Sequence, residues 1–571
     1  MNQPTIPIAL AAPDRRRKRQ APKGRRVQLA ALAEVQALLA GEPPRRDRLI
    51  EYLHRINDRH GQLGTPHLAA LAQELKLAQT EVYEVASFYH HFDVVRERPD
   101  GTVPAAPALT VRVCDGLSCE MAGARDLLQR LPALLGAEVR VIPAPCVGRC
   151  EQAPVAVVHQ RAVPRADVAA VQRCVVTKTT MPDATPHVGL AAYLAQGGYA
   201  LLRECVDGRR DVEGVLKTLE DSGLRGLGGA GFPAGRKWRI VRNEPAPRLM
   251  AVNIDEGEPG TFKDRHYLER DPHRFIEGML IAAWAVGIDA IYVYLRDEYH
   301  DCRVMLEAEL AALRAAPPAG VLPMIELRRG AGAYICGEES AMIESIEGKR
   351  GLPRLRPPYV AQVGLFGRPT LEHNFETLYW VRDLLEKGAA WFASQGRRGR
   401  KGLRSFSVSG RVRSPGVKLA PAGITLRELI DEHCGGMADG HTLYGYLPGG
   451  ASGGILPASL ADVPLDFDTL QPHGCFIGSA AVVVLSDKDT AVNAARNTMR
   501  FFAHESCGQC TPCRAGTAKA LTLIEQSQWD LPLLAELSQV MRDASICGLG
   551  QAAPNPVDCV VKYFPHELKG A

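Results

Sequence analysis

The chain has 571 residues, enough for three to five domains, and its 46% hydrophobic and 23% charged residues are typical of globular proteins. Its net charge is +4, but residues 1–26 hold eight Lys and Arg against Asp14 alone, a local +7 that leaves −3 for the remainder. The folded part is therefore not basic, which argues against nucleic-acid binding. The sequence also contains no run of eighteen uncharged apolar residues, the length that a membrane-spanning helix needs.

The basic segment 1–26 is expected to be a disordered tail; a docking arm for an acidic partner is the alternative. Arg25-Arg26 precedes a stretch that contains Glu34 and has helical spacing, which argues against a twin-arginine export signal. The fifteen cysteines are clustered, a pattern that favours metal ligation in a reducing compartment over disulfides. We therefore expect a cytoplasmic protein.

Residues 27–105 predict a helical bundle. Apolar residues such as Leu49 and Leu53 recur at helical spacing in DRLIEYLHRINDRHG. Thr65 and Pro66 are then expected as an N-cap followed by proline at the first helical position. This segment should pack as several short helices.

Residues 106–178 predict a small α/β unit with its cysteines in loops after strands. A helix is expected near 122–135, and a linker at 177–186. The predicted strands are LTVRV (109–113), VRVI (139–142) and VAVV (155–158).

The remainder divides into three regions, which makes the chain a multidomain α/β protein. Residues 188–402 predict a larger α/β domain, residues 403–492 a compact strand-rich module and residues 493–571 a set of helices. In the larger domain we expect strands at LMAVN (249–253) and AIYVYL (290–295) and a helix at FIEGMLIAAWAV (275–286).

The stretch ESCGQCTPCRAG has the spacing C-x2-C-x2-C. Cys507, Cys510 and Cys513 can aim three thiolates at a [4Fe–4S] cluster, whose fourth ligand usually comes from elsewhere in the chain. Cys547 in SICGLGQAAPNP is the best candidate for that ligand. Zinc is the alternative, although zinc sites more often use two separated C-x2-C pairs, and a disulfide is disfavoured.

A second set has two pairs, Cys114 with Cys119 and Cys146 with Cys150. Two pairs on facing loops can hold a [2Fe–2S] cluster, with two thiolates on each iron. Zinc remains the alternative on spacing alone. Most of the other seven cysteines are expected to be buried thiols.

The stretch RGLGGAGFPAGRKW contains the pattern Gly226-x-Gly228-x-x-Gly231. A dinucleotide fingerprint requires a strand directly before it, and the preceding VEGVLKTLEDSG predicts a helix, so we reject a standard Rossmann fingerprint here. A flexible loop is the alternative. Glycine-dense backbone beside Phe232 and Lys237 instead suits phosphate binding.

Two acidic loops share this character, although each could be an ordinary surface loop. NIDEGEPGTFKDR follows a predicted strand, and RGAGAYICGEES supplies further glycines and acids. Ligands bind after strands in α/β sheets, and acids suit the hydroxyls and amides of a nucleotide. The three loops together predict a nucleotide or flavin site near iron–sulfur centres.

The glycine loop, the two acidic loops and the stretch ESCGQCTPCRAG together resemble the NADH-oxidising flavoprotein subunit of respiratory complex I. They also resemble its relatives in NAD-reducing hydrogenases and formate dehydrogenases. The resemblance covers about 190–565, while residues 30–175 resemble the neighbouring thioredoxin-like [2Fe–2S] subunit. The fusion and GGASGGILPASLADVPLDF (449–467) look most like the β subunit of NAD-dependent formate dehydrogenase. The resemblance implies a Rossmann-like FMN/NAD domain at 188–402, a β-grasp-type (SLBB-like) module at 403–492 and a helical [4Fe–4S] domain at 493–571.

The family also implies the cofactor contacts. The positions matching FMN contacts are Gly226, Gly228, Gly229, Lys237, Asn253, Asp255, Glu256, Tyr334, Gly337, Glu338, Asn374 and Thr377. Those matching NAD(H) contacts are Phe232, Glu258 and Glu339. Three departures weaken single contacts: His373 replaces a frequent asparagine, Leu227 an arginine and Tyr359 a phenylalanine.

No catalytic nucleophile or strong general base is expected, because the cofactors carry the chemistry. The expected role is a diaphorase that takes electrons from formate oxidation through iron–sulfur clusters to FMN and NAD⁺. The partner would be a molybdenum- or tungsten-pterin α subunit with further iron–sulfur clusters, and the [2Fe–2S] centre could be a side branch. The alternatives are the diaphorase of an NAD-reducing hydrogenase, a complex I module, or a non-catalytic scaffold with structural zinc.

Overall fold

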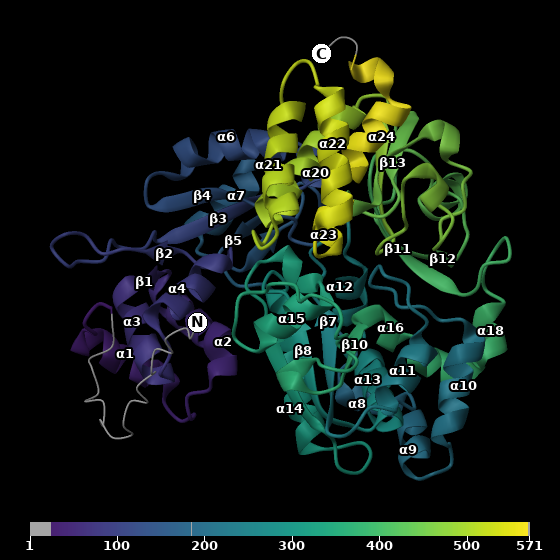
Figure 1. Cartoon of the computed structure of the whole chain (residues 1–571), viewed down its shortest axis with the longest axis horizontal. Coiled ribbons are helices and arrows are strands. Elements are labelled where there is room, and N and C mark those ends of the chain that lie inside the picture. Colours follow the sequence, from purple (N-terminus) through teal and green to yellow (C-terminus); the bar gives the residue numbers. More distant parts are fainter. Residues whose placement is uncertain (1–23, 184, 569–571) are drawn as a thin grey trace, which may run out of the picture.

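The computed structural model describes residues 24–183 and 185–568. The predicted basic tail lies almost entirely outside the described residues. Five regions follow one another in Figure 1: the helical bundle and the small α/β unit on the left, the larger α/β domain at the lower right, and the strand-rich module and the C-terminal helices at the top.

The N-terminal bundle contains the expected helices: α1 (Leu29–Leu39), α2 (Leu49–His60), α3 (Thr65–Leu75) and α4 (Gln79–Phe88). The predicted cap of α3 is wrong by one residue. Gly64, not Thr65, is the N-cap and no side chain caps this end, so Pro66 is the second helical residue. The reason is that strand β1 (Leu63–Gly64) pairs with β2 (Val94–Val95), which keeps the backbone extended through Gly64.

The small α/β unit has a four-stranded sheet in the order β4-β3-β5-β6, in which β3 and β4 are parallel. The predicted strands are all present. Its elements are β3 (Leu109–Cys114), α5 (Leu117–Met121), α6 (Ala124–Leu135), β4 (Val139–Ala144), β5 (Ala156–Val158), β6 (Arg161–Val163) and α7 (Val168–Val176).

The larger domain is built on a parallel sheet in the order β10-β7-β8-β9. Its strands are β7 (Arg248–Ile254), β8 (Ile288–Leu295), β9 (Met324–Arg329) and β10 (Thr370–Asn374). The principal helices are α10 (Val212–Ser222), α11 (Ala234–Arg242), α12 (Lys263–Leu268), α13 (Pro272–Val286), α14 (His300–Ala315), α15 (Glu339–Ile346) and α16 (Phe375–Tyr379). Shorter ones are α8 (Leu190–Ala195), α9 (Ala200–Val206), α17 (Val381–Lys387) and α18 (Ala389–Ala393).

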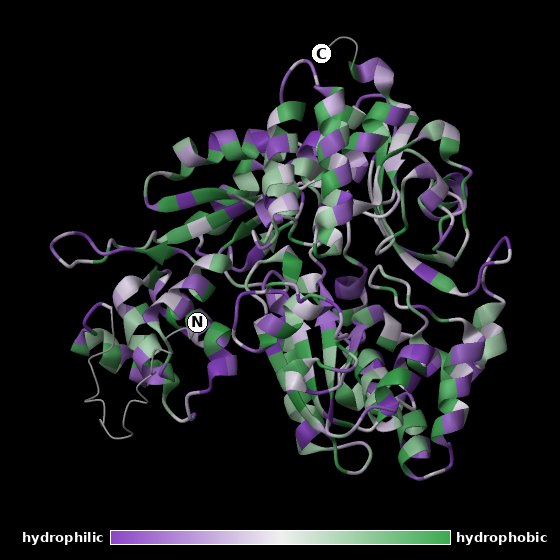
Figure 2. Ribbon diagram, viewed as in Figure 1, coloured by the Kyte–Doolittle hydropathy of each residue, from purple (hydrophilic) through white to green (hydrophobic). Residues whose placement is uncertain are grey.

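The central strands β7 and β8 of this sheet are buried on both faces, which explains their long apolar runs. Because side chains alternate along a strand, Met250 and Val252 pack in the core that contains α13, whereas Ala251 packs in the core that contains α15. The second core continues into the N-terminal bundle, so the bundle is docked on this side of the domain. Figure 2 shows the apolar colouring concentrated on these central strands.

The strand-rich module has a mixed sheet in the order β12-β11-β15-β13-β14. Its strands are β11 (Leu403–Gly410), β12 (Gly416–Pro421), β13 (Leu443–Leu447), β14 (Leu456–Pro457) and β15 (Ala481–Ser486). The helix expected in ITLRELIDEH begins at α19 (Leu426–Glu428), where Thr425 and Glu428 form a capping box.

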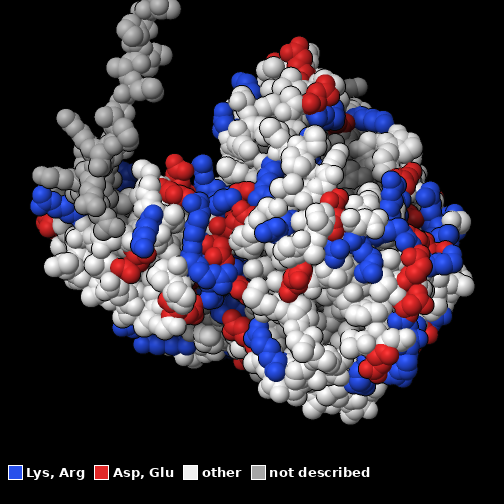
Figure 3. Space-filling model, turned by 60° about the horizontal axis from the view of Figure 1, so that its bottom comes forward, with Lys and Arg blue, Asp and Glu red and all other residues white. Residues whose placement is uncertain are grey.

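The C-terminal helices are α20 (Ala491–Glu505), α21 (Thr511–Ile524), α22 (Leu531–Ala544), α23 (Gly548–Ala552) and α24 (Asn555–Tyr563). They share an apolar core with the strand-rich module. Positive and negative side chains are interspersed on the face of the molecule in Figure 3, so that face carries no large patch of one sign.

Candidate functional site

A cavity of about 540 Å³, lined by several charged side chains, opens at the carboxyl ends of the parallel strands. Its walls include the loop after β7 (255–258), the segment after β9 (334–339) and the end of β10 (372–374). Loops after parallel strands converge at one edge of the sheet, which is where ligands bind in α/β folds. The predicted glycine loop closes the cavity from the side of α11.

The glycine loop connects α10 to α11, so a helix precedes it, as predicted. The amide of Gly226 donates to the carbonyl of Phe232 across 2.8 Å and closes the loop at its base. A Cβ added at Gly228 would lie 2.9 Å from the Cβ of Asn374, so this close approach requires glycine. The loop is therefore a tight cradle of backbone amides rather than a flexible connection.

Fourteen of the fifteen predicted cofactor contacts line this cavity. The exception is Thr377, which is buried in α16. Its hydroxyl oxygen accepts from the amide of Leu227 across 2.9 Å and so holds the glycine loop in place. The fourteen are Gly226, Gly228, Gly229, Phe232, Lys237, Asn253, Asp255, Glu256, Glu258, Tyr334, Gly337, Glu338, Glu339 and Asn374.

Asp255 offers an acceptor to a ligand. Its Oδ2 atom is buried without a hydrogen-bond partner among the described residues, and burial raises the pKa of this carboxyl well above its usual value. Asn253 stabilises the adjacent backbone, since its side chain accepts from the Asp255 amide and donates to the Gly337 carbonyl (3.0 and 2.9 Å). The unsatisfied oxygen fits a hydroxyl or amide donor of a flavin or nucleotide.

Glu256 and Glu338 lie at the cavity but also cap helices. Glu256 accepts from the amides of Asp264 and Arg265 at the start of α12 and from the Tyr299 hydroxyl. Glu338 accepts from two amides in the first turn of α15. Carboxylates at helix N-termini are favourable because they satisfy free amides and the helix dipole. Both acids therefore have a structural use.

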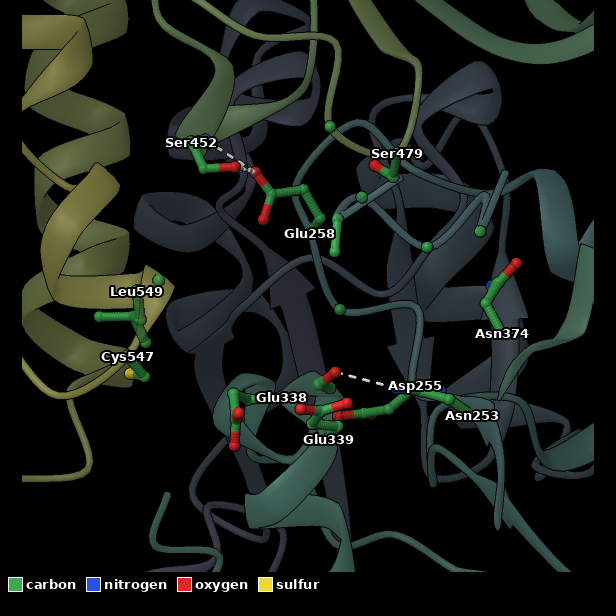
Figure 4. A pocket seen from close by; sticks show the side chains of 18 of the residues that line it. Asn253, Asp255, Glu258, Glu338, Glu339, Asn374, Ser452, Ser479, Cys547 and Leu549 are labelled. Atoms are coloured by element: carbon green, nitrogen blue, oxygen red, sulfur yellow. Dashed lines mark hydrogen bonds between the residues drawn. The ribbon is translucent and has the colours of Figure 1, made fainter. Parts of the chain in front are cut away.

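Glu258 is fixed by three hydrogen bonds from two parts of the chain. Its Oε1 accepts from the amide and the hydroxyl of Ser452, both at 2.7 Å, and its Oε2 accepts from the Tyr334 hydroxyl. Figure 4 shows Ser452 reaching Glu258 from above the cavity. The carboxylate is 9% exposed, and burial raises its pKa. Its position is thus set before any ligand binds.

Lys237 contributes a cation to the glycine-loop side of the cavity. Its ammonium lies 3.1 Å from the carbonyl oxygen of Glu372 and 3.3 Å from Oε2 of the same residue. Burial raises the pKa of the Glu372 carboxyl even though the Lys237 charge opposes this shift. Lys237 is close enough to the glycine loop to meet an anion there as a point charge.

The four cysteines of the C-terminal helices converge as predicted. Cys507, Cys510, Cys513 and Cys547 together line a small cavity between the start of α21 and the start of α23. Burial raises the pKa of the Cys513 thiol to about 11 and that of Cys547 to about 12, so a metal is needed to hold them as thiolates at neutral pH. Cys547 also lines the large cavity, at its left edge in Figure 4.

The second cysteine set is fully buried where the small α/β unit meets the larger domain. Cys114, Cys119, Cys146 and Cys150 are each at most 6% exposed, and the sulfurs of Cys146 and Cys150 are 3.3 Å apart. The expectation that both pairs lie in loops is only partly right. Cys114 ends β3 and Cys119 lies on α5, whereas Cys146 follows β4 and Cys150 begins a single 3-10 turn.

The spacing of the thiols separates clusters from zinc. Four sulfurs at about 2.3 Å from one tetrahedral zinc lie about 3.8 Å apart. In the described part of the chain, the groups of three or more ligand atoms within 4.8 Å of one another include neither cysteine set. A cluster spreads its thiolates because each iron takes its own ligands. Both sets therefore fit iron–sulfur clusters.

Comparisons with known families agree with this interpretation of the sites. The Nuo51 FMN-binding domain matches residues 219–383, and the thioredoxin-like [2Fe–2S] ferredoxin family matches 35–178. The NADH-ubiquinone oxidoreductase-F iron–sulfur binding region matches 493–571, and an SLBB domain matches 405–456.

One NADH-quinone oxidoreductase subunit of Rhizobium meliloti is 41% identical over 393 residues, which is 66% of this chain and 93% of that protein. The chain belongs to the NADH-quinone oxidoreductase flavoprotein family. Mitochondrial NADH dehydrogenase flavoprotein 1 of Dictyostelium discoideum is also 41% identical, over 67% of this chain and 83% of that protein. A chain of an NAD⁺-reducing [NiFe]-hydrogenase crystal structure aligns with a TM-score of 0.79 and 34% identity over 92% of both chains.

As a member of this family, the chain binds FMN, NAD(H), a [4Fe–4S] cluster and a [2Fe–2S] cluster. It is an NAD-dependent oxidoreductase of the flavoprotein-subunit type. The described part of the chain has no helix that is both long enough and apolar enough to span a membrane.

Several residues that line the large cavity were not predicted as cofactor contacts. Thr261, Lys263 and Asp264 belong to the predicted acidic loop stretch, so their proximity could have been expected. Others come from modules distant in sequence, where the glycines of GGASGG and of SICGLGQAAPNP were the only signals. These are Ser452, Phe476, Gly478 and Ser479 of the strand-rich module and Ile546, Gly548, Leu549, Gln551 and Ala552 of the C-terminal helices.

Proposed function

We propose that this chain is the diaphorase subunit of an NAD-dependent formate dehydrogenase, which exchanges single electrons with iron–sulfur clusters and a hydride with NAD(H). One observation carries the redox part of the proposal. Cys547 lines both the four-cysteine cavity and the large cavity, so a [4Fe–4S] ligand forms part of the flavin-site wall.

Within the large cavity we assign the glycine loop and Lys237 to the phosphate of FMN. We assign Asn253, Asp255, Tyr334, Gly337 and Asn374 to its polar groups. Thr377 supports the loop through Leu227. Glu256 and Glu338 keep a place in this set because they border the cavity, although their carboxylates also cap helices.

The nicotinamide side is assigned to Phe232, Glu258 and Glu339. Phe232 is 38% exposed at the cavity and presents an aromatic face for stacking. Bound FMN supplies chemistry with either one or two electrons, and the chain's residues orient the nucleotide against it. Glu258 suits this positioning role because Ser452 and Tyr334 hold it in a single place.

The [2Fe–2S] site is proposed as a side branch of electron transfer. Buried arginines fasten it to the flavin domain: Arg265 donates to the carbonyl of Gly148, and Arg296 donates to that of Cys146. Phe262, from the loop after β7, packs on Cys146 and Cys150. These contacts fix the [2Fe–2S] site against the loop after β7.

The formate assignment rests on the fused architecture and on GGASGGILPASLADVPLDF, which resemble formate dehydrogenase β subunits. Formate would be oxidised in a molybdenum- or tungsten-pterin α subunit that carries further iron–sulfur clusters. We place the complex in the cytoplasm, since the clustered cysteines favour metal ligation in a reducing compartment over disulfides.

A diaphorase subunit of an NAD-reducing hydrogenase is the second candidate. The specific observation in its favour is the alignment of nearly the full chain, 92% on each side, with the [NiFe]-hydrogenase structure. Both assignments share the redox chemistry of the site and differ only in the partner.

Purification of the full chain from its native cells, with its bound partners, tests the proposal. We expect a partner that contains molybdenum or tungsten, together with formate-dependent NAD⁺ reduction by the complex. A nickel-containing partner with hydrogen-dependent NAD⁺ reduction would overturn the formate assignment in favour of a hydrogenase diaphorase. NADH-driven dye reduction by the isolated chain checks the flavin site independently of the partner.

A further inference from the structure

Three ligand-type side chains meet where the N-terminal bundle docks on the flavin domain. His54 lies on α2, His91 follows α4, and Asp297 follows β8. One ligand atom from each lies within 4.8 Å of the other two. We propose that this junction, outside both cysteine sites and the flavin cavity, binds one divalent transition-metal ion of the Zn²⁺ class.

His54 is already in the tautomer that a metal requires. Its Nε2 lies 2.8 Å from the carbonyl oxygen of Gly330, which can only accept, so Nε2 carries the proton and Nδ1 has the free lone pair. The side chain is 2% exposed, and Nδ1 has no partner among the described residues. Metal-binding histidines usually donate their second N–H to a carbonyl in this way.

His54 is buried against Phe92, with ring centroids 4.8 Å apart, an environment that favours the neutral imidazole. A neutral imidazole is the form that binds metals. A buried lone pair without a donor is uncommon in folded proteins, and a cation is one of the few groups that would satisfy it.

His91 supplies the second nitrogen. Its Nδ1 lies 2.7 Å from Oδ2 of Asp297, and its amide donates to the carbonyl of Ala331. Nδ2 of Asn57 lies 3.5 Å from Nε2 of His91, while Oδ1 of Asn57 is buried without a partner in the described chain. If the side-chain amide of Asn57 is rotated by 180°, its Oδ1 can accept from Nε2–H of His91. The lone pair on Nδ1 of His91 is then available for the metal.

Asp297 supplies a charged oxygen. Its ion pair with Arg329 favours the charged form of this carboxylate. Arg329 occupies only Oδ1, at 2.5 Å, so Oδ2 stays directed at His91. The Arg329 charge is itself paired with Asp58 at 2.7 Å, which reduces its repulsion of a cation at the site.

The donor set and the access both suit zinc. Two imidazole nitrogens and one carboxylate are a borderline-soft set, preferred by Zn²⁺ over Mg²⁺ or Ca²⁺. His91 and Asp297 also line a second cavity of about 350 Å³, which shares Asp255 and Tyr334 with the flavin cavity and is lined by Cys146 as well. It provides an entry path and room for a water as the fourth ligand. An ion here would join α2, the segment after α4 and the loop after β8, and so fasten the bundle to the flavin domain.

The test uses the full holo-chain with its flavin and iron in place. After incubation with ZnCl₂ and gel filtration, metal analysis should find about one retained zinc per chain with no loss of iron. X-ray absorption at the zinc edge should show only N and O neighbours at about 2.0–2.1 Å, without sulfur at about 2.3 Å. Sulfur in the shell would place the zinc on cysteines and overturn the proposal, as would no retained zinc.

Two junction variants and one control locate the ion. His54→Phe and Asp297→Asn should each lose this zinc while keeping normal flavin and iron contents. The control is His67→Gln in a second, more exposed trio formed by Glu34, His60 and His67, whose ligand atoms also lie within 4.8 Å of one another. Zinc that persists in Asp297→Asn, or that disappears in His67→Gln instead, would overturn the assignment.

Discussion

Replacing Gly228 by alanine should weaken flavin binding. The added Cβ would lie 2.9 Å from the Cβ of Asn374, whereas unstrained carbon contacts are about 3.5–4.0 Å. Asn374 cannot easily withdraw, because it donates to Asp264 at 2.7 Å and caps α16 through the amide of Thr377. The strain must therefore displace the glycine loop or Asn374, both of which we assign to FMN.

Overpacking of this kind costs about 1–3 kcal/mol, which corresponds to a loss of about 5- to 150-fold in FMN affinity if only the bound geometry is affected. Fluorescence titration of the flavin-free chain with FMN measures this ratio. Gly214→Ala on α10 is a control outside the cavity, since its Cβ would meet only the side chain of Asp211, at 3.4 Å or more. Wild-type affinity in Gly228→Ala, or an equal loss in the control, would refute the packing argument.

Three further changes test other parts of the site. Cys547→Ser should remove the [4Fe–4S] cluster, lowering iron from about six to about two atoms per chain, while Cys559→Ser on the neighbouring helix α24 should leave iron unchanged. Ser452→Ala removes one of two donors to Oε1 of Glu258 and should raise the KM for NADH about fivefold, at about 1 kcal/mol, with the FMN content unaltered; an unchanged KM would argue against the positioning role. Burial, aided by a neighbouring carboxylate, raises the pKa of Glu256 from 4.5 to about 7. The folded state thus holds this proton more tightly than the unfolded chain. As the pH rises from about 4.5 to about 7, this group therefore lowers the free energy of unfolding. Glu256→Gln should flatten that slope in urea titrations, and a slope identical to wild type would contradict the shift.

Local chemistry allowed much of the molecule to be predicted. The apolar runs of β7 and β8 and the spacing of Cys507, Cys510 and Cys513 are properties of short stretches, and the structure shows them as expected. Cys547 lines the same small cavity, where a Cβ added at the nearby Gly550 would lie 2.8 Å from the Cβ of Cys513, and its role as the fourth ligand stays a prediction.

What could not be predicted depends on contacts between segments far apart in sequence. Ser452 reaches Glu258 only because the strand-rich module folds over the cavity, and no periodicity in either stretch reports that contact. The extended backbone before α3 was missed for the same reason, since Gly64 is held by pairing with Val95. Glu256 was predicted only as a ligand contact because its helix-capping role appears once α12 is in place.

The flavin cavity takes its walls from residues as distant as Gly226 and Ala552. During synthesis, the glycine loop and the parallel sheet can fold long before the segment around Cys547 has been translated. Stable capture of the flavin must then await the last of these contributors. We therefore expect flavin retention to depend on the C-terminal helices, which supply the last of these walls.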